Sequence, residues 1–127
     1  MDTNTNIITW FEVPVSDFDR AQTFYETIFD IQINALQMGP LLMGLFPSEQ
    51  GNGKVSGALC QHEWYKPSSD GPLIYFNANP NLQTILDRVE KSGGKIIVYK
   101  KQISQDIGYM AVVIDTEGNR IALHSQN

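Results

Sequence analysis

The side chains best suited to acid–base chemistry in this chain are one glutamate and one histidine on expected strands. Glu12 is the clearest acidic residue inside a strand-like run, and His124 is one of only two histidines, the other being His62. A carboxylate and an imidazole can both transfer protons, so both residues are candidates for catalysis. The alternatives are structural: His124 as a hydrogen-bonded residue at a strand end, and Glu12 as a carboxylate at a cleft mouth, bonded to arginine or tyrosine.

Nucleophilic chemistry has less support in the sequence. Cys60 is the only cysteine and has no base beside it along the chain, so we interpret it as a buried thiol. Gly51-Asn52-Gly53 is typical of a turn and not of a phosphate loop, because no helix with a Lys-Ser/Thr pair follows it. The lone cysteine excludes an internal disulfide and indicates a reducing compartment.

Two similar runs of expected elements position these side chains. Each run has a strand, a helix and three further strands, and the second run follows the first after about 64 residues. The first run has strands at 7–15, 31–37, 41–46 and 55–61 and a helix at 17–29. The second has strands at 73–78, 95–100, 109–115 and 120–125 and a helix at 82–92. At this offset the apolar helix positions match in pairs: Phe18 with Leu82, Ala21 with Ile85, and Tyr25 with Val89.

The ends of these elements carry residues with clear positional preferences. Ser16 or Asp17 is expected to cap the first helix, and Gly93-Gly94 is expected to end the second. Pro14 places the end of the first strand at a sheet edge or bulge, because proline cannot donate to a neighbouring strand. Turn-forming residues at 62–72 predict a loop between the two runs, and residues 101–108 predict another.

Bulk composition limits the classes of function. The chain has 127 residues, which fits one domain with two modules, at about 7–61 and 73–125. A net charge of −5 disfavours nucleic acid as a partner, because phosphate binding needs clustered lysine and arginine. No apolar run approaches the roughly 18 residues that span a bilayer, and no signal peptide is visible. We therefore expect a cytoplasmic protein without membrane partners.

Several segments carry a family resemblance. The run WFEVPVSDFDRAQTFYETIF, then GPLIYFNANPNL, VEKSGGKI and GYMAVVIDTEGNRIALHS, resembles the vicinal oxygen chelate superfamily of glyoxalase I, bleomycin-resistance proteins and extradiol dioxygenases. The chain looks most like the small, single-domain, glyoxalase-related members. The resemblance implies an α+β fold of two βαβββ modules whose curved mixed sheets form a cleft. It also implies frequent homodimerisation, sometimes with modules exchanged.

The resemblance further implies a divalent metal held by histidine or glutamate at four strand positions, and this chain departs from that pattern. The matching positions carry Trp10, Ala58 or Cys60, Leu73 and Ala122. Of these residues only the cysteine can ligate a metal, and one thiolate makes no site. We therefore expect no metal and no cofactor. A site built from Glu12, His124 and Cys60 is the alternative.

These observations favour a metal-free module that binds a small, partly apolar molecule in a cleft between the modules. An apolar lining with a few polar groups is typical of such sites. The expected ligand-binding residues are Trp10, Glu12, Cys60, Tyr75, Tyr109 and His124. The alternatives are a lyase or isomerase of the glyoxalase type, with or without a metal, and a structural or regulatory dimer. The sequence does not identify the ligand.

Overall fold

The computed structural model describes residues 2–49 and 51–127, and these residues form two modules of similar layout. Module one contains β1 (Trp10–Pro14), α1 (Phe18–Phe29), β2 (Asn34–Met38), β3 (Leu41–Leu45) and β4 (Ser56–Gln61). Module two contains β5 (Ile74–Asn77), α2 (Leu82–Val89), β6 (Lys95–Ser104), β7 (Gly108–Ile114) and β8 (Arg120–Ser125). A short 3-10 turn, Glu90–Ser92, follows α2.

Each module has one mixed sheet of four strands. The strand order is β1-β4-β3-β2 in sheet A and β5-β8-β7-β6 in sheet B. The first strand of each module runs parallel to the last, and the other neighbouring strands are antiparallel. The predicted α+β fold of two βαβββ modules with mixed sheets is therefore confirmed. β1 is an edge strand, in agreement with the expectation from Pro14.

Both helices begin and end as their sequences indicate. The Asp17 carboxylate caps α1 by accepting from the N–H of Arg20, and Asn81 caps α2 by accepting from the N–H of Gln83. Gly93 has a φ of 102° and ends the turn after α2, a conformation that glycine adopts without strain. In the described part of the chain no helix is long and apolar enough to cross a membrane.

The main difference from the predicted elements concerns β6. This strand continues to Ser104, so the predicted loop at 101–108 shrinks to the three residues 105–107. Its end is polar because β6 is an edge strand whose exposed residues face water, and polar character was misinterpreted there as a loop. The register with β7 shifts three times along β6, and such irregularities weaken the alternation from which strands are predicted.

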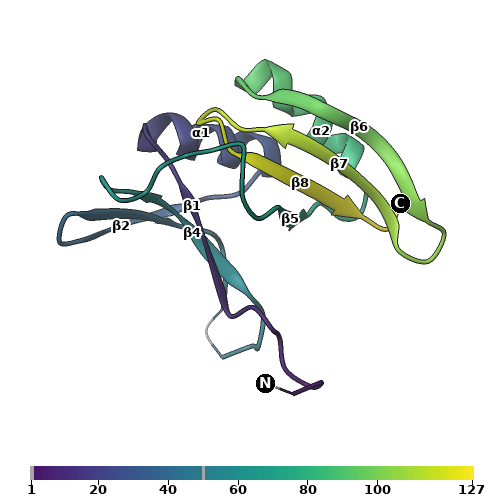
Figure 1. The fold of residues 1–127 in the computed structure, drawn as a ribbon, viewed down its shortest axis with the longest axis horizontal. Helices are drawn as coiled ribbons and strands as arrows, with labels where there is room; N and C mark the ends of the chain where they lie inside the picture. Colours follow the sequence, from purple (N-terminus) through teal and green to yellow (C-terminus); the bar gives the residue numbers. More distant parts are fainter. Residues whose placement is uncertain (1, 50) are drawn as a thin grey trace.

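One apolar core joins the two modules. Residues from α1, α2 and one face of each sheet belong to the same buried cluster, and the rings of Tyr25, Phe46 and Phe76 meet in it. Figure 1 shows α1 and α2 close to each other, with the two sheets extending to different sides. The opposite face of each sheet carries no helix, and we call it the open face.

The turn from Asp115 to Asn119, between β7 and β8, ties module two to module one. The hydroxyl of Tyr25 on α1 donates to Oδ2 of Asp115 at 2.6 Å, and Nδ2 of Asn119 donates to the carbonyl of Pro14 at 2.7 Å. Burial and the neighbouring Asp115 raise the pKa of Tyr25 well above its ordinary value, so its hydroxyl keeps its proton. Directional bonds therefore fix how the two modules meet.

Candidate functional site

The open face of sheet A carries a carboxylate held by two aromatic side chains. Side chains alternate along a strand, so Trp10 and Glu12 of β1 project to the same face. Oε1 of Glu12 accepts from the hydroxyl of Tyr65 at 2.7 Å, and Oε2 accepts from the indole N–H of Trp10 at 3.3 Å. Trp10 remains 43% exposed, so its ring offers a free surface on this face.

Cys60 lies on β4 beside this group and is fully buried. Burial, followed by the negative charge of Glu12, raises the pKa of the Cys60 thiol to about 12. The hydrogen bond to Glu12, with burial second, raises the pKa of Tyr65 to about 12 as well. A thiol and a phenol of this kind keep their protons near neutral pH and do not act as nucleophiles. This group can bind or orient a ligand through Glu12 and Trp10.

The open face of sheet B holds a cavity of about 510 Å³. Two sequence-predicted residues, Tyr75 and His124, line it. Tyr75 is 51% exposed because its ring stands on the side of β5 that faces away from the core. The remaining lining residues are Phe76, Asn77, Asn79, Ile103 and Ile107. This composition, mostly apolar with a few polar groups, is typical of a small-molecule site.

The polar groups of this cavity are held in place by neighbours. Nε2 of His124 lies 2.6 Å from the carbonyl oxygen of Ile107, in the turn between β6 and β7. Oδ1 of Asn77 accepts from both the backbone N–H and the side-chain amide of Asn79, at 3.0 and 2.8 Å. His124 is therefore a hydrogen-bonded residue near the end of β8, which is the structural alternative to a catalytic role given in the sequence analysis.

A single chain does not bring the six predicted ligand-binding residues into one cleft. Trp10, Glu12 and Cys60 lie on the open face of sheet A, whereas Tyr75 and His124 line the cavity on sheet B. The reason is the shared core: the modules meet through their helix-covered faces, so their open faces do not close over one space. Glu12 and His124 consequently do not form an acid–base pair within one chain.

Tyr109 lies apart from both groups in the single chain. It packs against the main core, on the helix-covered face of sheet B. The ammonium of Lys100 lies 4.6 Å from the centre of its ring. Tyr109 pairs with Ser125 in β8, so its side chain lies on the same face as that of Ser125. His124 is the residue before Ser125 and therefore points to the opposite face from Tyr109.

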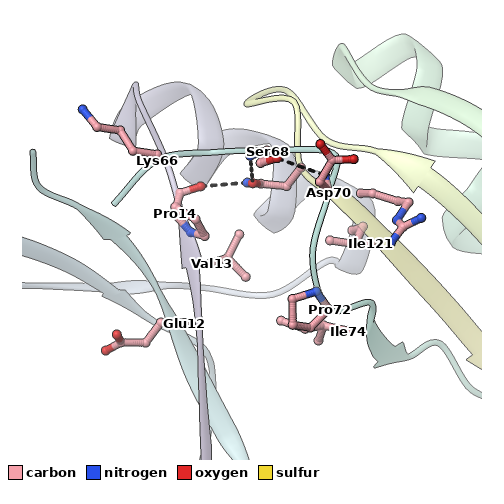
Figure 2. A pocket seen from close by; sticks show the side chains of 11 residues that line it. Glu12, Val13, Pro14, Lys66, Ser68, Asp70, Pro72, Ile74 and Ile121 are labelled. Atoms are coloured by element: carbon pink, nitrogen blue, oxygen red, sulfur yellow. Dashed lines mark hydrogen bonds between the residues drawn. The ribbon is translucent and has the colours of Figure 1, made fainter. Parts of the chain in front are cut away.

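A smaller cavity of about 200 Å³ lies between β1 and the connection at 62–72 (Figure 2). Val13, Ile74 and Ile121 form its apolar interior, and Glu12 points to the other side of β1 from Val13. Asn119 closes one side by bonding both the carbonyl of Pro14 and the N–H of Ser68. This cavity is part of the joint between the modules.

The four positions at which the resemblance implies metal ligands lie on the expected strands or at their borders. Ala58 and Cys60 on β4 and Ala122 on β8 are fully buried, and Leu73 lies directly before β5. Ala58 pairs with Glu12, and Ala122 pairs with Tyr75. Across residues 2–49 and 51–127, no three His, Cys, Asp or Glu side chains come together in a group that could hold a metal ion.

Sequence reasoning missed several residues of both groups. Asn77 follows Tyr75 at the two-residue spacing of one strand face, and this alternation could have identified it. Tyr65 lies in the connection between modules, where no periodicity reports which way a side chain points. Ile103 and Ile107 fell in the predicted loop at 101–108, which hid their position beside the cavity.

Comparisons with known proteins agree with this geometry. A family model described as bleomycin resistance protein-like N-terminal matches residues 8–43. No curated protein matches the chain.

Solved structures share the fold over nearly the whole chain. A glyoxalase/bleomycin resistance protein from Albidiferax ferrireducens has a TM-score of 0.69 at 16% identity and covers 96% of this chain and 100% of its own. The trypanothione-dependent glyoxalase I of Leishmania major has a TM-score of 0.68 at 14% identity and covers 96% and 88%.

Glyoxalase I from Zea mays has a TM-score of 0.62 at 13% identity, over 92% of this chain and 45% of its own. The chain therefore spans about half of the maize protein's length. This chain has the fold of the glyoxalase/bleomycin resistance/dioxygenase proteins, and its residues 8–43 are similar to the bleomycin resistance protein-like N-terminal family.

Proposed function

We propose that this chain is a small-molecule-binding protein that holds its ligand in the cavity on sheet B and needs no resident metal to do so. The observation that carries the proposal is the cavity itself, about 510 Å³ in volume and lined by Tyr75, His124 and isoleucines. This volume lies within the range of about 300–1,000 Å³ that small-molecule sites occupy. The ring of Tyr75 supplies a stacking surface, and His124 supplies a polar contact.

Binding without metal chemistry is favoured by the residues on the strands. The side chains at the metal-equivalent positions are an indole, three aliphatic groups or, in the alternative register, a thiol. None of the first four donates a lone pair to a metal ion. His124 uses Nε2 to bond Ile107, and the carboxylate of Glu12 belongs to the other sheet. A lyase or isomerase of the glyoxalase type is the alternative.

We further propose that the protein acts in the cytoplasm as a homodimer in which the open face of sheet A meets sheet B of a second copy. Leu36 and Met38 on β2 are 44% and 56% exposed, and Trp10 adds a third large apolar side chain on that face. Exposed apolar residues gathered on one face are typical of an interface. In such a dimer the indole of Trp10 of one copy extends the apolar wall of the cavity of the other, while Glu12 stays bonded to Tyr65 and Trp10 of its own chain.

A ligand screen followed by one variant tests the proposed site. Thermal melting against a panel of small aromatic and aliphatic compounds identifies a stabilising ligand, and its shift in melting temperature is then measured for Tyr75→Ala. We expect the shift to disappear in Tyr75→Ala and to persist in Tyr99→Ala, a matched control on exposed β6. If the ligand raises the melting temperature of Tyr75→Ala as much as that of the wild type, the ligand does not bind in this cavity.

Metal analysis tests the alternative. We expect the purified protein to carry no stoichiometric divalent metal, and added Zn²⁺ or Ni²⁺ to leave its melting temperature unchanged. Stoichiometric metal, or a clear rise in melting temperature on metal addition, would favour the lyase or isomerase.

A further inference from the structure

The cavity on sheet B contains two polar side chains that lie next to each other on neighbouring strands. β5 and β8 run parallel, and Asn77 is the register partner of His124. Tyr75 is the partner of Ala122 one step earlier on the same face, where the small methyl group leaves the tyrosine ring uncovered. The floor of the cavity therefore combines an aromatic ring with an amide and an imidazole placed side by side.

The amide of Asn77 presents a fixed hydrogen-bond donor. Its Oδ1 already accepts two hydrogen bonds from Asn79, and Oδ1 of Asn79 in turn accepts from the N–H of Gln126 at 2.8 Å. Nδ2 of Asn77 donates to no residue that the structure describes. Because the oxygen side is held by this chain of bonds, the NH₂ group is the side left for a ligand.

The imidazole of His124 presents an acceptor. A carbonyl oxygen can only accept, so the short contact between Nε2 and the oxygen of Ile107 requires the hydrogen to be on Nε2. In the neutral ring Nδ1 then carries a lone pair. Donor and acceptor thus stand on adjacent strands, which are about 4.8 Å apart.

The lining of the cavity favours a neutral ligand over a charged one. The residues that line this cavity include no aspartate, glutamate, lysine or arginine. A charged ligand would leave water without a counter-charge, at a cost in free energy. A neutral ligand with one donor and one acceptor loses less free energy on leaving water, because both groups find hydrogen-bond partners in the cavity.

We infer that the cavity selects a flat, neutral ligand with a hydrogen-bond acceptor next to a donor, such as a primary carboxamide or a lactam. Its carbonyl accepts from Nδ2 of Asn77, and its N–H donates to Nδ1 of His124. Its ring lies against Tyr75, and its apolar part contacts Ile103 and Ile107. This inference rests on the proposed function, because it names the ligand class of the same cavity.

Four probe compounds separate the features of the ligand. Benzamide has both groups, N,N-dimethylbenzamide lacks the donor, benzoate is an anion and benzylamine is a cation. Amide and aromatic NMR signals of the full-length protein report binding at Tyr75, Asn77 and His124. We expect benzamide to bind with the lowest Kd, and loss of one hydrogen bond to weaken N,N-dimethylbenzamide roughly fivefold or more.

Two variants test whether His124 and Asn77 produce the preference for benzamide. His124→Gln keeps a donor for the carbonyl of Ile107 and removes the Nδ1 acceptor, so the preference for benzamide over its dimethyl analogue should fall to about one. Asn77→Asp replaces the donor by a carboxylate, and we expect benzamide binding to weaken roughly tenfold. Asn52→Asp, an exposed position in the loop between β3 and β4, is the matched control and should leave both affinities unchanged.

The outcomes distinguish this inference from the proposed function. If the probes bind in the cavity but benzamide has no advantage, or if its advantage survives in His124→Gln, the inference is wrong and the binding function stands. If none of the four compounds shifts the signals of Tyr75 or His124 at its solubility limit, both are overturned.

Discussion

Oε2 of Glu117, in the turn between β7 and β8, accepts a hydrogen bond from Nε of Arg20 on α1 at 2.8 Å. Oε1 of the same carboxylate accepts from the backbone N–H groups of Ser16 and Asp17 at 2.9 and 2.8 Å. A glutamate of module two therefore binds the start of the first helix of module one, where helix N–H groups lack partners and favour negative charge.

Loss of this carboxylate should destabilise the protein more than loss of the arginine. We expect Glu117→Gln to lower the free energy of unfolding by about 1–3 kcal/mol, because the buried side chain accepts several hydrogen bonds. Arg20 is half-exposed and screened by water, so Arg20→Ala should lower the free energy of unfolding by clearly less than Glu117→Gln does. Urea denaturation measures both, with exposed Glu90→Gln as the control. Equal losses for the two variants would mean that the ion pair, and not the backbone contacts, makes the joint.

The same residue predicts how stability depends on acid. Burial alone would raise the pKa of Glu117, but hydrogen bonds from Arg20, Asp17, Thr116 and Ser16 lower it from the ordinary 4.5 to about 2. The folded state therefore binds this proton less readily than the unfolded state does. The contribution of Glu117 to stability is present above pH 4.5 and declines as the pH falls towards 2.

Denaturation at a series of pH values checks this directly. The difference in unfolding free energy between wild type and Glu117→Gln should be constant above pH 5 and should shrink at lower pH. A difference that stays the same down to pH 2 would show that the carboxylate titrates normally in the fold.

The thiol of Cys60 should be inert in the folded protein. Burial and the charge of Glu12 raise its pKa to about 12, so at pH 8 very little thiolate is present. We expect a disulfide reagent such as DTNB to react at least ~100-fold more slowly with the native protein than with the urea-unfolded one. Glu12→Gln should increase the native rate, whereas exposed Glu63→Gln should not. Rapid reaction of the native wild type would contradict the buried placement.

The proposed dimer predicts a change of mass in solution. Met38→Glu places a charge on the apolar open face of sheet A, at the end of edge strand β2, and should convert the dimer to a monomer. Light scattering after size-exclusion chromatography measures this. Ile7→Glu changes a side chain that is 73% exposed and lies before β1, so it should leave the mass unchanged. A monomeric wild type at micromolar concentration would refute the dimer.

The helices and most strands could be predicted because their signals are local. Asp17 and Asn81 cap helices through bonds to residues two or three positions away, and the apolar spacing of α1 and α2 lies within each helix. The predicted strand ended too early because the second half of β6 is an exposed edge, where Ile103 alone among polar residues makes no alternating pattern. Local sequence therefore determines the elements well where one of their faces is buried.

The site was harder to predict because it depends on relations between strands. Sequence alone does not tell which face of β7 matches which face of β8, and the observed register turns Tyr109 to the core while His124 faces outward. It also does not tell that the modules meet through their helix-covered faces. The six residues therefore remain a prediction as ligand contacts, and in the single chain five of them are divided between two surfaces while Tyr109 packs against the core.

The buried carboxylate of Asp115 has a consequence for how much change the molecule tolerates. It is 3% exposed and accepts from Tyr25, from Asn119 and from the backbone of its own turn. Apolar neighbours can exchange one aliphatic group for another and slide slightly, whereas a carboxylate moved away from its donors would sit in a dry interior with its charge unmatched. The angle between the two modules should therefore stay the same when other residues of the chain change. Sequence variation should accumulate on the open faces of the two sheets, where new binding specificities can arise without disturbing the joint between the modules.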